Sequence, residues 1–173
     1  MFAKLDRRRF LRTSAVAVAG TAVAGSEFLA APDGAWAMTV TTLGKAAAAT
    51  LIRMARDLFP HDSIGDTAYA KVVEKLDRRA GADQQLAGLL KDGVTALDAA
   101  AKEGYAAASE ARRIAILKSM ETTPFFQTVR VAMAKDFYND EAVWKALGYE
   151  GSSAEFGGYL HRGFDDIDWL PRI

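Results

Sequence analysis

The chain has 173 residues, with 22 basic and 22 acidic side chains, two histidines and no cysteine. The balanced charge argues against a nucleic-acid-binding protein, which needs a clustered basic excess. The lack of cysteine excludes disulfides, thiolate nucleophiles and cysteine-ligated metal clusters.

The first twelve residues carry the pattern of an export signal. Arg7 and Arg8, followed by Phe10 and Leu11, match the twin-arginine motif, which directs proteins across the membrane in the folded state. An Ala/Val-rich stretch follows at 13–24. It is too short and too mildly apolar to span a bilayer stably, since a membrane helix needs about 20 apolar residues. We therefore expect a periplasmic protein, exported by the twin-arginine route.

The end of the signal is indicated by small residues. Ala35 and Ala37 give the small-x-small pattern of signal peptidase sites, so we expect residues 1–37 to be removed and Met38 to begin the mature chain. A weaker cleavage point near Ala24 or Ala31 is an alternative. An uncleaved signal that anchors a scaffold to the membrane is another.

The mature chain reads as helical almost throughout, which predicts one all-α domain of five to six helices over residues 38–147. Helix starts and stops come from capping residues and from proline and glycine. The expected helices are one from Thr41 or Thr42 to Phe59, one capped by Asp66 and ending at Ala80, one from Asp83 through Leu97, one from Ser109 through Met120, one from Thr123 through Phe137, and one capped by Asn139 and Asp140 that ends at Gly148.

Two kinds of residue inside these helices indicate packing. Gly93 costs a helix about 1 kcal/mol relative to alanine, so it predicts either a close helix contact or a kink. Met54, Met120 and Met133 fall on apolar helical faces, where methionine usually fills gaps in a core.

Residues 148–173 differ in composition from the helices. They contain five glycines and five aromatic residues, which predicts an irregular segment that is too apolar for a solvated linker. Such a tail packs either on its own domain or on a partner subunit. Aromatic side chains on irregular backbone are typical of interface anchors, so Tyr159, Phe164 and Trp169 are candidates for partner docking.

The groups needed for catalysis or metal binding are sparse. His61 and His161 have no third soft ligand, whereas zinc and copper sites usually have three or four protein ligands. Asp165, Asp166 and Asp168 lack the spacing of an EF-hand, so a polar rim at an interface is favoured over a calcium site. The chain also has no nucleophile elbow, Walker loop, dinucleotide fingerprint or haem-attachment motif. We expect no catalytic, cofactor-binding or metal-binding residues.

Five segments of the mature chain form a recognisable set of motifs: LIRMARDLFPHD at 51–62, YAKVV at 69–73, VWKALGYEG at 143–151, GGYL at 157–160 and GFDDIDWLP at 163–171. Together they resemble the gluconate 2-dehydrogenase subunit 3 family, the small signal-bearing subunits of sugar and polyol dehydrogenases. The resemblance covers nearly the whole mature chain and is most specific in the tail.

This resemblance implies a non-catalytic subunit that partners a larger FAD-containing oxidoreductase of the glucose-methanol-choline type. In such complexes a cytochrome c subunit commonly takes the electrons, and the complex is periplasmic or associated with the membrane. The large subunit often lacks a signal and is carried out by the small one, which also assists its folding. The motif residues here are structural or docking positions: Trp144, Tyr149, Gly157, Gly158, Tyr159, Phe164 and Trp169, with Asp165 and Asp166 beside them.

A protein of another class remains as the alternative. A stand-alone periplasmic ligand-binding protein or helical enzyme would have its own pocket with convergent polar groups.

Overall fold

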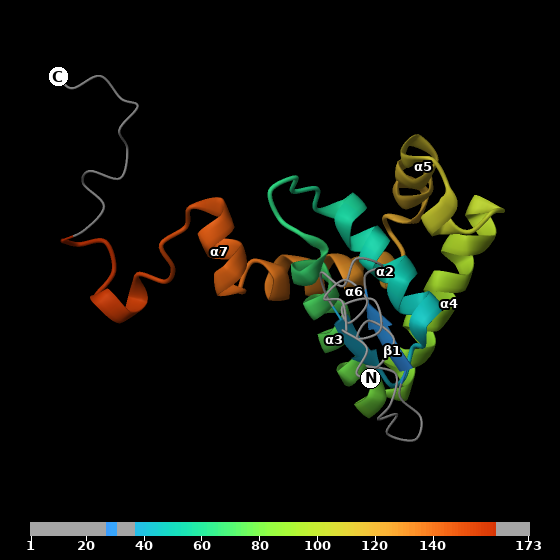
Figure 1. Cartoon of the computed structure of the whole chain (residues 1–173), viewed down its shortest axis with the longest axis horizontal. Helices are drawn as coiled ribbons and strands as arrows, with labels where there is room; N and C mark the ends of the chain where they lie inside the picture. The colour runs from blue at the N-terminus through green and yellow to red at the C-terminus, as the bar shows by residue number, and fades with distance from the viewer. Residues whose placement is uncertain (1–26, 31–36, 162–173) are drawn as a thin grey trace, which may run out of the picture.

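Six α-helices form most of the part of the chain that this computed structural model describes, residues 27–30 and 37–161 (Figure 1). The all-α prediction is confirmed. The helices are α2 (Lys45–Leu58), α3 (Asp66–Ala82), α4 (Gln84–Ala101), α5 (Glu110–Met120), α6 (Pro124–Ala132) and α7 (Glu141–Leu147). Shorter helical turns are η1 (Tyr105–Ala107), the π-helical η2 (Met133–Phe137) and η3 (Ala154–Phe156).

A short hairpin precedes the helices. Strand β1 (Glu27–Ala30) pairs antiparallel with β2 (Ala37–Val40), and Leu29 lies opposite Met38. Sequence reasoning missed this hairpin because residues 1–37 were assigned to the signal. Met38 and Val40 are 3% and 0% exposed while Thr39 is exposed, as expected for a strand with one face on the core. The hairpin is therefore part of the packing.

Four predicted helix caps are confirmed. The side chains of Asp83, Ser109, Thr123 and Asp140 each accept a hydrogen bond from a backbone N–H in the first turn of the helix that follows. Each such bond satisfies a donor that the helix itself leaves unpaired. Gly148 ends α7 in the left-handed conformation, as is common for glycine after a helix.

Two other predicted caps are wrong. The N-cap of α2 is Gly44 rather than Thr41 or Thr42, and the N-cap of α3 is Gly65 rather than Asp66. Asp66 instead pairs with Arg56 across the α2–α3 connection. The backbone and hydroxyl groups of Thr41 and Thr42 are taken by a distant carboxylate, described below.

The core is organised around α3, which contacts β2, α2, α4 and η2. Its largest fully buried side chains come from every one of these elements and from η1: Val40, Leu51, Met54, Tyr69, Leu76, Leu90, Leu97, Tyr105, Met133 and Phe137. The predicted packing role of Met54 and Met133 is confirmed, and Met120 packs at the edge of the same cluster.

Helices α4 and α6 meet at a glycine. A Cβ atom on Gly93 would lie 2.1 Å from Cδ2 of Phe125, far inside van der Waals contact. Phe125 is itself buried. Of the two predictions for Gly93, a close helix contact is the one confirmed.

None of the helices among residues 27–30 and 37–161 has the length and apolar character needed to cross a membrane.

Candidate partner-docking surface

The chain leaves the helical body at α7, and residues 141–161 are called the arm here. In Figure 1 the arm, coloured orange to red, projects away from the other helices. Its base is held by three contacts: Val143 is buried, Asp140 accepts a hydrogen bond from Lys71 Nζ at 2.8 Å, and the indole N–H of Trp144 donates to the carbonyl of Tyr138. The start of the arm is thus fixed in place.

An aromatic cluster supports this base. Phe137, at the end of η2, packs on Tyr69 with ring centroids 4.7 Å apart, and His61 stacks on Phe137 at 5.6 Å. His61 Nε2 also forms a 2.8 Å hydrogen bond with the hydroxyl of Tyr138. His61 therefore contributes to packing and hydrogen bonding at the base of the arm. Rings packed from three segments set the direction in which the chain leaves the body.

Beyond its base the arm is exposed. Apart from Val143, none of its residues is buried. It holds five of the eight large apolar side chains exposed in the described part of the chain, with exposed fractions from 44% to 75%: Leu147, Tyr149, Phe156, Tyr159 and Leu160. A short segment that exposes this much apolar surface is typical of an interaction site.

The arm also has a shallow hollow of about 360 Å³ between α7 and the segment after it. Its wall includes Trp144 and Tyr149, whose rings meet edge to face at 5.6 Å. Three carboxylates line it (Glu141, Glu150 and Glu155), against one cation, Lys145. Aromatic faces beside carboxylates suit a basic side chain from a partner.

Two glycines reverse the chain near the end of the arm. Gly157 and Gly158 have φ values of 77° and 79°, which side chains with a Cβ rarely adopt. A hydrogen bond from Gly158 N–H to the carbonyl of Ser153 at 2.9 Å closes the turn. Phe156 and Tyr159 flank this turn, so the glycine pair determines how the two rings are presented.

The predicted docking residues are partly brought together. Trp144 and Tyr149 form one contact and Tyr159 lies on the same arm, half exposed. Phe164, Asp165, Asp166 and Trp169 lie outside the described residues, as do Arg7, Arg8, Phe10, Leu11 and Ala35. Sequence reasoning omitted Leu147, Phe156 and Leu160 as docking residues. Their signal was present: they are apolar residues in or beside the glycine-rich segment.

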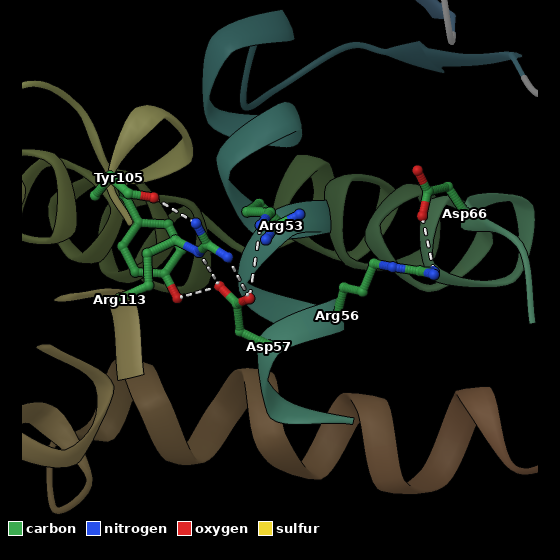
Figure 2. A network of polar contacts seen from close by, with 7 residues as sticks. Arg53, Arg56, Asp57, Asp66, Tyr105 and Arg113 are labelled. Carbon is green, nitrogen blue, oxygen red and sulfur yellow. Dashed lines mark hydrogen bonds and ion pairs between the residues drawn. The ribbon is translucent and has the colours of Figure 1, made fainter. Parts of the chain in front are cut away.

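The strongest buried polar cluster lies elsewhere, between α2, η1 and α5 (Figure 2). Arg113 donates to Asp57 through Nε at 2.7 Å and through Nη2 at 3.1 Å, and the hydroxyl of Tyr105 donates to the same carboxylate at 2.8 Å. Arg53 adds an ion pair at 3.5 Å. Sequence reasoning gave no indication of this cluster.

This cluster is built for packing. The side chains of Asp57 and Arg113 are 7% and 5% exposed, and Tyr105 is fully buried, so a substrate cannot reach them. Burial, with the hydrogen bond to Asp57, raises the pKa of Tyr105 far above its ordinary value. The hydrogen bond to Asp57 raises the pKa of Arg113. Tyr105 and Arg113 therefore keep their protons, and the cluster joins three elements of the fold.

A second buried carboxylate holds the segment between β2 and α2. Asp77 of α3 accepts hydrogen bonds from the backbone N–H groups of Thr41 at 2.8 Å, Thr42 at 3.1 Å and Leu43 at 2.8 Å, and from the Thr41 hydroxyl at 2.9 Å. Burial alone would raise the pKa of Asp77, but these hydrogen bonds together lower it. The charged carboxylate is the form that the fold requires.

The described residues contain no cluster of three or more His, Asp or Glu side chains placed to hold a metal ion. His161 is exposed at the end of the arm.

Comparison with protein-family models, with curated proteins and with solved structures finds no match to this chain.

Proposed function

We propose that this chain is the non-catalytic small subunit of a periplasmic or membrane-associated FAD-dependent sugar, polyol or aldonate dehydrogenase. It escorts the larger flavoprotein of the glucose-methanol-choline type through the twin-arginine route, assists its assembly and stabilises it. In this proposal FAD belongs to the large subunit; where the complex includes a cytochrome c subunit, that subunit takes the electrons.

The exposed arm is the observation that carries the proposal. Most of the large apolar side chains of the helical body are buried, whereas the arm presents Tyr149, Phe156 and Tyr159 to solvent. Exposing such side chains is costly in an isolated protein, and aromatic residues are enriched at interface centres. A subunit that docks through the arm would cover this surface.

The charges of the arm indicate the kind of surface that it would meet. The hollow beside Trp144 carries three glutamates and one lysine. A partner surface with arginine or lysine side chains would complement it, and a cation placed against the indole face adds attraction. We therefore expect the docking surface of the flavoprotein to be basic at this point.

The buried charges favour a supporting role. Asp57, Arg113 and Asp77 are engaged in holding helices and the β2–α2 connection together. The twin-arginine route exports proteins that are already folded. In this proposal the flavoprotein binds FAD and folds in the cytoplasm, so the complex needs a route for folded proteins.

Co-expression of this chain with a candidate flavoprotein of the glucose-methanol-choline type from the same organism tests the proposal. A tag on this chain should recover a yellow complex from the periplasm, and Arg7→Lys with Arg8→Lys should leave both proteins in the cytoplasm. The unsubstituted signal is the control. Export of the flavoprotein despite the two substitutions, or a purified small chain that is itself yellow, would contradict the proposal.

A further inference from the structure

A second hollow lies on the helical body, where α3, α4 and α6 meet. Its volume is about 360 Å³, and its wall is mostly apolar. Leu76 and Ala132 line it and are almost fully buried, whereas Val131, on the same wall, is 53% exposed. The body therefore offers an open apolar surface next to its own core.

The neighbouring surface of α3 is basic. Arg79 lines the apolar hollow and also a smaller one of about 270 Å³, which it shares with Lys75, Arg78 and Asp136. Asp136 pairs with Arg79 at 2.8 Å and lies 3.8 Å from Lys75. Three cations thus face one carboxylate. The two hollows meet at Arg79 and are together called the body groove, with an apolar part and a basic end.

The arm has the complementary chemistry. Its hollow carries three glutamates and one lysine, so its charge is opposite to that of the body groove. Phe156 and Tyr159, beside the glycine turn, are 65% and 53% exposed. Burying such rings against an apolar wall is favourable, and opposite charges around the contact determine its register and partner. The arm and the body groove therefore match in both apolar surface and charge.

The arm does not cover the groove of its own chain. It projects away from the other helices (Figure 1), and Val143 at its base is the one arm residue that is buried. Every copy of the chain nevertheless carries a body groove. An anionic lipid surface suits the arm less well, because such a surface attracts basic segments and repels glutamates.

We propose that two copies of this chain associate by exchanging arms, so that each arm lies in the body groove of the other copy. The same contact then occurs twice around a twofold axis, and the assembly closes at two copies. The exchange uses the arm that the proposed function assigns to the flavoprotein, so the pair and the flavoprotein complex exclude each other. The tests below use this chain alone, and their failure leaves the proposed function intact.

The first test is sedimentation equilibrium of the purified chain from about 1 to 100 µM, the range in which small interfaces associate. The mass should rise from one copy to two across this range. A single copy at every concentration would overturn the proposal. Assemblies of more than two copies would also overturn it, since reciprocal exchange closes at two.

The second test reverses the charges of each surface in turn. Arg78→Glu with Arg79→Glu changes the body groove, and Glu150→Arg with Glu155→Arg changes the arm. Each variant alone should pair with a Kd at least about tenfold higher, because like charges then face each other. An equimolar mixture of the two should pair again, because each arm meets a groove of opposite sign. Restored pairing also shows that both variants are folded, and a mixture that stays monomeric would overturn the proposal.

The control changes the net charge by the same amount elsewhere on the body. Lys91→Glu with Lys118→Glu alters two exposed lysines, one on α4 and one on α5. This variant should pair with a Kd within about threefold of the unsubstituted chain, since surface charges away from a contact act weakly. A loss as large as that of the Arg78→Glu, Arg79→Glu variant would overturn the proposal, because net charge rather than the groove would then control pairing.

Discussion

Arg113 of α5 and Asp57 of α2 form a buried ion pair, with Nε and the carboxylate oxygen 2.7 Å apart. They lie 56 positions apart in the chain. Tyr105 donates to the same carboxylate, so one acid joins α2, η1 and α5. Removing two charges from water is costly, and such a pair stabilises a fold only when both partners remain.

Arg113→Met should destabilise the protein strongly because it leaves Asp57 buried with too few partners. Loss of one member of a buried pair costs about 3–5 kcal/mol, and we expect the lower end because Tyr105 and Arg53 still approach the carboxylate. Urea denaturation followed by circular dichroism measures the loss. The double variant Asp57→Leu with Arg113→Met should lose less than Arg113→Met alone. A larger loss in the double variant would contradict this account.

The pair between Lys71 and Asp140 is the control. Its Nζ–oxygen distance is 2.8 Å, but the lysine side chain is half exposed, and exposed pairs contribute about 0–1 kcal/mol. Lys71→Ala should therefore change the unfolding free energy by less than about 1 kcal/mol. Similar losses for Lys71→Ala and Arg113→Met would show that burial is not the deciding factor.

Gly93→Ala should also destabilise, because the new methyl group would collide with the ring of Phe125. Overpacking of this kind costs about 1–3 kcal/mol. Gly88 lies in the same helix, and a methyl group added there would have no neighbouring atom within 4 Å. Gly88→Ala should stabilise by about 0.5–1 kcal/mol, since alanine favours helix. The two variants should therefore shift the thermal midpoint in opposite directions, and a shift in the same direction would refute the close contact.

The helices could be predicted because their boundaries are encoded locally. Asp83, Ser109, Thr123 and Asp140 each precede the helix that they cap by one position, so a reader of the sequence sees cap and helix together. The failures at Thr41 and Asp66 have the opposite cause. Their partners, Asp77 and Arg56, lie outside the local window, at separations of 36 and 10 positions.

The candidate site shows the same division. Composition predicted an irregular, aromatic and glycine-rich tail that packs on its own domain or on a partner, and the structure leaves Tyr149, Phe156 and Tyr159 of the arm exposed. Whether an apolar side chain lies on the body or off it depends on where the helical bundle ends. Phe156 and Leu160 are visible in the sequence as apolar residues of the glycine-rich segment, but the sequence of the tail alone does not show whether they lie against the body or away from it.

Asp77→Asn should make stability less dependent on acid. The folded pKa of Asp77 is lowered from its ordinary value of 3.8, so its charge stabilises the fold above that value and the contribution is lost as pH falls through the folded pKa. At pH 7 the variant should be less stable by about 1–3 kcal/mol, because an amide oxygen cannot replace both carboxylate oxygens as acceptors. Urea titrations from pH 7 to pH 2 should show the two proteins converging below pH 3.8. A constant difference over this range would rule out the charged form as the acceptor.

Substitutions in the arm should separate binding from stability. Tyr149→Ser with Phe156→Ser removes two exposed rings from residues that are not part of the core. The free energy of unfolding should change by less than about 0.5 kcal/mol for each, as for most surface substitutions. Affinity for the co-purified flavoprotein should fall at least tenfold, since loss of a central aromatic anchor costs about 2 kcal/mol or more.

Ile114→Ser with Val131→Ser removes two exposed apolar side chains from the helical body instead and serves as the matched control. Calorimetric titration measures the affinity of both variants, and thermal melts measure their stability. Equal loss of affinity in the two variants would show that the arm is not the docking surface. A lower melting temperature in the arm variant alone would show that its rings pack against the chain itself.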